Sequence, residues 1–121
     1  MRESAVPAPG WVTHPWVATS AATVSFGIAN GPRGDWPALV EFVAEMEELG
    51  YDSFWSSDHP VPSAGCFTTL AGLAATTQRI RLGSLVACLY YRNPVDLART
   101  ALDIDAMSGG RLILGLGIGD I

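Results

Sequence analysis

The feature that most constrains the fold is a repeated alternation of short β-type segments with amphipathic helical ones. Four segments have the apolar, β-branched or aromatic character of buried strands, at residues 24–28, 51–56, 80–86 and 111–117. Three segments between them place apolar residues at helical spacing, at residues 35–50, 67–77 and 93–110. Apolar strands that alternate with helices predict a parallel sheet covered by helices. The expected order is therefore β-α-β-α-β-α-β.

The first predicted helix has clear boundaries. Asp35 can cap its start, and Pro37 is tolerated because the first turn leaves its N–H groups unpaired anyway. Gly50 can close the helix in a left-handed conformation. Its apolar face is expected to consist of Leu39, Val43, Met46 and Leu49.

Two architectures fit this order: an open doubly wound sheet, with the first strand central, and part of a (β/α)8 barrel. A complete barrel takes about 250 residues, so 121 residues supply about half of one, with two open sheet edges. Function gathers beyond the carboxyl ends of the strands in both architectures. The Pro-, Ala- and Thr-rich residues 1–22 show no period, so we expect a loose extension followed by a domain at 23–121.

The charge pattern excludes several classes of partner. The net charge is −5, and the seven cationic residues are scattered arginines, which argues against nucleic-acid binding. No apolar run approaches the roughly 18 residues of a membrane helix, and the N-terminus lacks the pattern of a secretory signal. Cys66 and Cys88 lie far apart, with only His14 and His59 as companions, so we expect reduced thiols, no metal site and a cytoplasmic protein.

The most informative pair at the predicted strand ends is Asp58-His59, which leaves the second strand directly into a proline-bounded loop. A histidine changes its charge near neutral pH, and a neighbouring carboxylate can bias its tautomer or raise its pKa. Two interpretations stay open for His59: a catalytic imidazole at the mouth of a barrel, and a loop histidine bonded to backbone.

Small residues follow the third and fourth strands. The run from Gly83 to Cys88 indicates either a bulge beside a ligand or core positions that face a bulky helix. Gly115, Gly117 and Gly119 precede Asp120, but their spacing is one residue short of a dinucleotide fingerprint and lies in the wrong strand. These glycines instead favour a close approach to the strand end or crowded packing.

Taken together, the ordered motifs resemble the bacterial luciferase-like family of flavin-dependent oxidoreductases, including its deazaflavin-dependent branch. The motifs that carry this resemblance are Gly50–His59, Thr77–Ser84, Tyr91–Pro94, Leu102–Asp103, Ser108–Arg111 and Gly115–Asp120. The resemblance covers residues 23–121 and implies the N-terminal half of a (β/α)8 TIM barrel. It also implies that the chain is a truncated piece of that barrel.

The resemblance also implies a site. His59 would lie beside the flavin or deazaflavin ring and the substrate, and Asp58 would hydrogen-bond the ring edge. A non-prolyl cis peptide in a bulge is expected at Leu85-Val86 or one residue to either side, pressed against one ring face. The expected cofactor-binding residues are Ser84, Leu85, Val86, Ala87, Gly119 and Asp120, with Asp120 where relatives often have Glu.

The implied activity is oxidation or reduction of a small organic substrate. Coenzyme F420, a deazaflavin, would exchange a hydride with the substrate while His59 exchanges a proton; reduced FMN would activate oxygen. Because phosphate sites of barrels form after strands seven and eight, we expect this chain alone to be inactive and to require a missing C-terminal half. The alternative is a non-catalytic remnant or assembly piece, such as a homo-oligomer, that pairs through open sheet edges.

Overall fold

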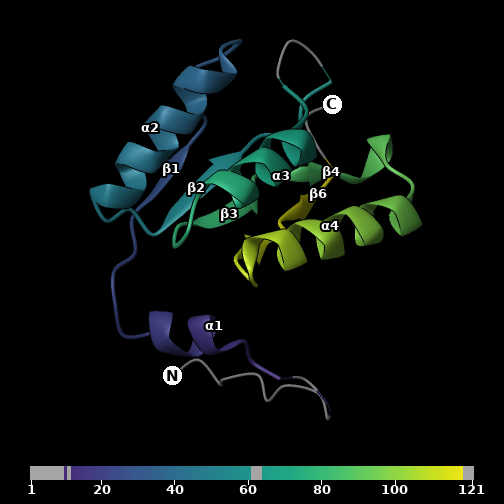
Figure 1. Ribbon diagram of the computed structural model, residues 1–121. Helices are drawn as coiled ribbons and strands as arrows, with labels where there is room; N and C mark the ends of the chain where they lie inside the picture. The colour runs from purple at the N-terminus through teal and green to yellow at the C-terminus, as the bar shows by residue number, and fades with distance from the viewer. Residues whose placement is uncertain (1–9, 11, 61–63, 119–121) are drawn as a thin grey trace.

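The computed structural model describes residues 10, 12–60 and 64–118, and its central feature is a parallel sheet (Figure 1). The sheet contains β1 (Gly27–Ala29), β2 (Ser53–Ser56), β3 (Arg81–Ser84) and β5 (Leu112–Ile113), in the order β1-β2-β3-β5. Every adjacent pair is parallel. Because β1 lies at the edge rather than in the centre, the doubly wound architecture is wrong, and the partial barrel is confirmed.

The third and fourth predicted strands are each divided into two short pieces. Beyond β3 and β5, the chain forms β4 (Ala87–Cys88) and β6 (Leu116–Gly117), which pair with each other in parallel. At the break, the Ser84 hydroxyl donates to the Gly115 carbonyl at 2.9 Å and accepts from the Gly115 amide at 3.0 Å. A Cβ atom on Gly115 would lie 2.3 Å from the Ser84 carbonyl oxygen, so this close approach requires glycine.

The long helices pack against one face of the sheet, and the hydrophobic core lies between them and that face. The long helices are α2 (Trp36–Glu48), α3 (Cys66–Thr76) and α4 (Pro94–Ser108), with a short 3-10 turn, η1 (Leu89–Tyr91), before α4. Figure 1 shows α3 between α2 and α4, and α3 contacts β2 and β3. Phe54 and Leu82, at most 1% exposed, project from these strands into a core that includes Val43, Leu70, Leu73, Ile80 and Ile104.

The opposite face of the sheet carries Trp55, whose neighbours in the register are Ala29 and Gly83. A Cβ atom on Gly83 would lie 2.4 Å from the indole ring, so Gly83 makes room for this side chain. In a closed barrel this face would line the interior. The small residue at position 83 is therefore an inner-face packing position rather than a bulge.

Two details of the predicted elements are wrong. The first strand begins at Gly27 rather than Val24: Val24 and Phe26 are 82% and 65% exposed, and Phe26 is bonded to Asp52, which precedes the start of β2. Leu49 ends α2 and is 66% exposed, whereas Glu47 is buried in its place. The Glu47 carboxylate accepts backbone N–H groups of Gln78, Arg79 and Ile80, which compensates for its burial.

The N-terminal region contains a regular element that the sequence did not predict. Helix α1 (Pro15–Ser20) is capped by His14, whose Nδ1 accepts the Trp16 amide, and none of its residues is buried. The Arg81 guanidinium lies 4.4 Å from the Trp16 ring centroid. Six residues are too few to show a helical period, which explains why the segment looked irregular.

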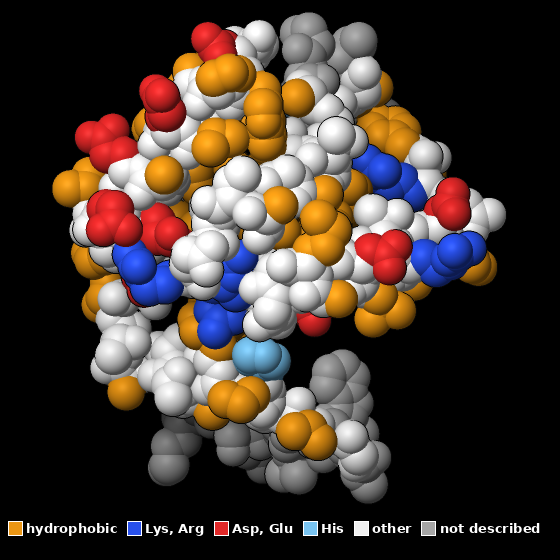
Figure 2. Space-filling view, viewed as in Figure 1, with side chains coloured by type: hydrophobic (Ala, Val, Ile, Leu, Met, Phe, Trp, Pro, Cys, Tyr) orange, Lys and Arg blue, Asp and Glu red, His pale blue; other side chains and the backbone are white. Residues whose placement is uncertain are grey.

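Charged side chains of both signs are present on the surface (Figure 2). On the face seen in Figure 2, acidic side chains gather along α2, and arginines are interspersed with acidic residues elsewhere. In residues 10, 12–60 and 64–118, every helix is too short or too polar to cross a membrane.

Candidate active site at the carboxyl ends of the strands

The first two strand ends are joined by Asn30 and Ser57. Asn30 follows β1 with φ of 55°, the left-handed conformation that Asn tolerates better than most residues. Its side-chain oxygen accepts the Ser57 hydroxyl at 2.9 Å and the Ser57 amide at 3.3 Å. This contact fixes the start of the segment that carries Asp58 and His59.

Asp58 is 8% exposed and is bonded to the loop that follows β4. Its Oδ2 accepts the Cys88 amide and Arg92 Nε, both at 3.0 Å, and its Oδ1 accepts Arg92 Nη2 at 2.6 Å. Burial by itself raises the pKa of this carboxyl, but the hydrogen bonds from Arg92 and Cys88 and the Arg92 charge lower it overall. Asp58 therefore stays ionised and ties the second strand end to the third.

Arg92 is held from a second direction as well, because its guanidinium lies 4.5 Å from the Phe67 ring centroid. The predicted contact of Asp58 with a ring edge stays a prediction, but both carboxylate oxygens already have partners within the chain. Sequence reasoning did not single out Arg92 as the partner of Asp58. The motif Tyr91–Pro94 contained it, but nothing in the sequence shows that it reaches back across 34 residues.

His59 follows Asp58 and is exposed at the rim. Asp58 is immobilised by its three bonds, so the backbone that presents the imidazole is fixed while the ring itself lies at the surface. Both interpretations stay open, because exposure at a strand end fits a proton-exchanging histidine and a loop histidine alike.

The cis peptide bond lies between Leu85 and Val86, as the resemblance predicted. The Leu85 amide donates to the Ser56 carbonyl at 2.8 Å, which anchors this bond beside β2. Leu85 is 52% exposed and Val86 is half-buried, so both can meet a ligand. Ser84 and Ala87 are fully buried, backbone included, so neither presents a surface to a ligand in this structure. Gly119 and Asp120 lie outside the described residues.

The two cysteines are free and buried, which agrees with reduced thiols. Burial raises the pKa of the Cys66 thiol to about 11, and Cys66 Sγ donates to the Ser56 carbonyl at 3.4 Å. Among residues 10, 12–60 and 64–118, no cluster of three His, Cys, Asp or Glu side chains could hold a metal ion.

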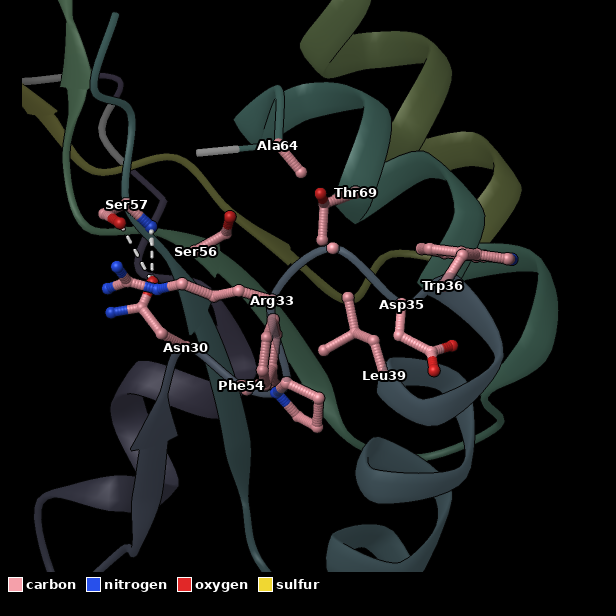
Figure 3. Close-up of a pocket in the computed structure, with 13 residues that line it drawn as sticks. Asn30, Arg33, Asp35, Trp36, Leu39, Phe54, Ser56, Ser57, Ala64 and Thr69 are labelled. Atoms are coloured by element: carbon pink, nitrogen blue, oxygen red, sulfur yellow. Dashed lines mark hydrogen bonds between the residues drawn. The ribbon is translucent and has the colours of Figure 1, made fainter. Parts of the chain in front are cut away.

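One feature of this end was not predicted. A cavity of about 370 Å³ lies beside the β1–α2 loop, between β2 and the starts of α2 and α3 (Figure 3). The turn-forming run from Asn30 to Asp35 was the available signal, but it was interpreted only as a strand stop and a helix cap.

The model of the luciferase-like monooxygenase family matches residues 13–121. The chain belongs to this family. It is 41% identical over 99 residues to a Mycobacterium tuberculosis protein whose name describes it as a coenzyme F420-dependent oxidoreductase, covering 80% of this chain and 28% of that protein.

Solved structures agree with this assignment. The coenzyme F420-dependent tetrahydromethanopterin reductase from Methanopyrus kandleri is 32% identical, with a TM-score of 0.75, over 82% of this chain and 28% of that one. The oxygenating component of 3,6-diketocamphane monooxygenase from Pseudomonas putida, in complex with FMN, is 19% identical, with a TM-score of 0.73, over 82% and 30%. This second likeness shows the fold alone. The chain thus spans less than a third of the length of these family members.

Proposed function

We propose that this chain forms the ring-binding part of an oxidoreductase that acts on a small organic molecule and uses coenzyme F420 or FMN. The observation that carries the proposal is that the exposed His59 and Leu85 lie at the same, carboxyl end of the sheet. Family membership supports the general class of activity.

The residues at this end fit a flat, largely apolar ring. Leu85 and Val86 offer apolar surface, and the imidazole of His59 offers a titratable group beside it. A bound deazaflavin would supply hydride transfer, and a bound reduced flavin would supply oxygen activation. His59 would exchange a proton with the substrate oxygen, while Asp58 and Arg92 position its loop. Gly119 and Asp120 are proposed to complete the lining.

Of the two cofactors, we favour coenzyme F420. Both of the relatives above that exceed 30% identity have names that include coenzyme F420. The structure with FMN is 19% identical and supports the fold only. The adjacent Asp58-His59 pair favours the same choice, because proton exchange at a substrate oxygen accompanies hydride transfer.

The residues that would hold the phosphate tail are expected elsewhere in the barrel, so we propose that residues 1–121 bind either cofactor weakly. The test is a ¹⁵N NMR titration of the chain with F420 and with FMN. We expect amide shifts confined to residues 58–59 and 84–88, with a Kd weaker than micromolar. Micromolar binding would refute the need for further barrel segments. A folded chain without shifts at these residues would refute the site itself.

A second candidate function is assembly through the sheet edges. In the part of the chain that the structure describes, β1 and β5 each pair with a single neighbouring strand. Phe26, Leu114 and Leu116 are exposed on or beside these strands. Because such edges can pair with another chain, a molecular mass that rises with concentration would support self-assembly, and a constant monomer mass would exclude it.

A further inference from the structure

The cavity of about 370 Å³ lies on the opposite face of β2 from Trp55. Phe54 and Ser56 alternate with Trp55 along the strand, so they face the helices rather than the inner face of the barrel. The proposed cofactor-binding residues His59, Leu85 and Val86 do not line it. The residues that matter for its chemistry are Arg33, Trp36, Leu39, Phe54, Ser56 and Thr69 (Figure 3).

Two hydroxyls line this cavity without a bond to the rest of the described chain. The residues Ser56 and Thr69 are 7% and 6% exposed, and neither side chain is bonded within the part of the chain that the structure describes. Their oxygens are not closed off from solvent, because among the described residues no fully buried side-chain oxygen or nitrogen lacks a partner. Both hydroxyls therefore open onto the cavity and can bond a ligand there.

The apolar side chains of Leu39, Phe54 and Trp36 form much of the remaining wall, and the cationic Arg33 lies at the mouth of the cavity. Leu39 and Phe54 are 8% and 1% exposed. Trp36 is packed against α3, since a Cβ atom on Gly72 would lie 2.3 Å from its indole. Arg33 extends from the loop toward Asn30 in Figure 3 and has no carboxylate partner among the described residues. The nearby Asp35 carboxylate caps α2 by accepting the Ala38 amide at 3.1 Å.

We propose that this cavity binds a small aromatic carboxylic acid that carries a hydroxyl or carbonyl group on its ring. The ring lies between Leu39, Phe54 and Trp36, its substituent bonds the Ser56 and Thr69 hydroxyls, and its carboxylate meets Arg33. Ligand cavities of about 300–1,000 Å³ with mostly apolar walls and a few polar groups are typical of small-molecule sites. The site is separate from the proposed cofactor site and does not depend on it.

The test uses 4-hydroxybenzoate as the probe in a ¹⁵N NMR titration of the 121-residue chain. We expect amide shifts at residues 30–36, 54–57 and 69, and none at the Leu85-Val86 bond. The double variant Ser56→Ala/Thr69→Val should weaken binding of 4-hydroxybenzoate about tenfold or more, because it removes both hydrogen-bond partners of the ring hydroxyl. The same variant should leave benzoate binding unchanged, since benzoate lacks the ring hydroxyl.

Substitutions at exposed positions provide the remaining tests. Arg33→Gln should weaken both benzoate and 4-hydroxybenzoate about fivefold, whereas Thr68→Val and Arg99→Gln, on exposed positions of α3 and α4, should change neither. The unliganded double variant should unfold at about the same temperature as the wild type, because neither hydroxyl is bonded to the rest of the described chain. A lower unfolding temperature, equal effects of Thr69→Val and Thr68→Val, or shifts elsewhere would overturn the proposal.

Discussion

The two ends of the sheet differ in how their polar groups are bonded. At the amino end, Arg111 and Glu47 are each 9% exposed, and both are bonded to backbone groups or a neighbouring hydroxyl. At the carboxyl end, Asp58 is bonded to Arg92 in a similar way, but the Ser56 and Thr69 hydroxyls make no bond within the described residues, and His59 and Leu85 are exposed. The buried charges of the amino end are therefore bonded within the chain, whereas the carboxyl end presents side chains at the surface and in a cavity.

The amino end is fixed mainly by Arg111, which precedes β5. Its guanidinium donates to the Ser108 carbonyl, the Thr77 hydroxyl and the carbonyls of Ile80, Ala74 and Thr77, at 2.6 to 3.1 Å. These five bonds join the end of α4 to the turn between α3 and β3. The carboxylate of Glu47, on α2, accepts the backbone N–H groups of the same turn. The turn between α3 and β3 is therefore bonded twice: its carbonyl groups accept from Arg111, and its amide groups donate to Glu47.

This difference shows that the motifs behind the family resemblance contain two kinds of residue. Some stabilise the amino end of the sheet, and others lie at the candidate site at its carboxyl end. The motifs Thr77–Ser84 and Ser108–Arg111 carry the resemblance together with Gly50–His59, yet Thr77, Ile80, Ser108 and Arg111 belong to a bonded cluster at the amino end, which we call the clamp. Only the motifs that end at the carboxyl side contribute to the candidate site. Position relative to the strand ends separates the two kinds, as expected for a barrel.

The largest expected effect is on the clamp. Replacing Arg111 with Met removes five hydrogen bonds and leaves buried carbonyls unpaired, so we expect a loss of about 3–5 kcal/mol in the free energy of unfolding. Urea unfolding measures it, with Arg99→Met on the exposed side of α4 as the matched control. A loss below about 1 kcal/mol, typical of a surface substitution, would remove the distinction between the two ends.

Glu47 gives the next largest effect and a dependence on pH. Burial raises the pKa of this carboxyl, but hydrogen bonds from the amides of Ile80, Arg79 and Gln78 lower it overall. Its stabilising contribution is therefore present above the ordinary Glu pKa of about 4.3 and is lost as the pH falls below it.

Glu47→Gln should cost about 1–3 kcal/mol at pH 7 and flatten the loss of stability between about pH 5 and 3. Glu48→Gln is the control, because its ion pair with Arg79 is exposed on both sides. Chemical unfolding at several pH values measures both variants. Equal pH profiles for wild type and Glu47→Gln would show that Glu47 contributes nothing through its charge.

The sequence predicted the strand and helix order and the helix cap at Asp35, and the family resemblance implied the position of the cis bond. These features depend on local patterns or on motifs of fixed spacing. It did not predict the buried Glu47, the Asp58–Arg92 pair or the cavity. Each of these depends on contacts between residues about 30 positions apart, where the hydrophobic pattern carries no information.

Asp58 should show an intermediate and local effect. Asp58→Asn weakens the bonds to Arg92 and to the Cys88 amide, which leaves the loop after β4 less well held. We expect about 1–2 kcal/mol of lost stability and faster amide hydrogen exchange at residues 88–92, with little change near Arg111. Asp103→Asn, on an exposed position of α4, is the control. Faster exchange across the whole sheet would show that Asp58 belongs with the clamp.

The smallest effect on stability is expected at His59, because its side chain is exposed at the carboxyl end of the sheet rather than buried at the amino end. An exposed side chain at the rim should be replaceable, so His59→Gln should change the free energy of unfolding by less than about 0.5 kcal/mol. If the imidazole lies beside the bound ring, the same variant should reduce the amide shifts that F420 or FMN causes at residues 84–88. A loss of 1 kcal/mol or more without any change in those shifts would mean that His59 is a structural loop residue. Proton exchange at the substrate would then need a residue other than His59.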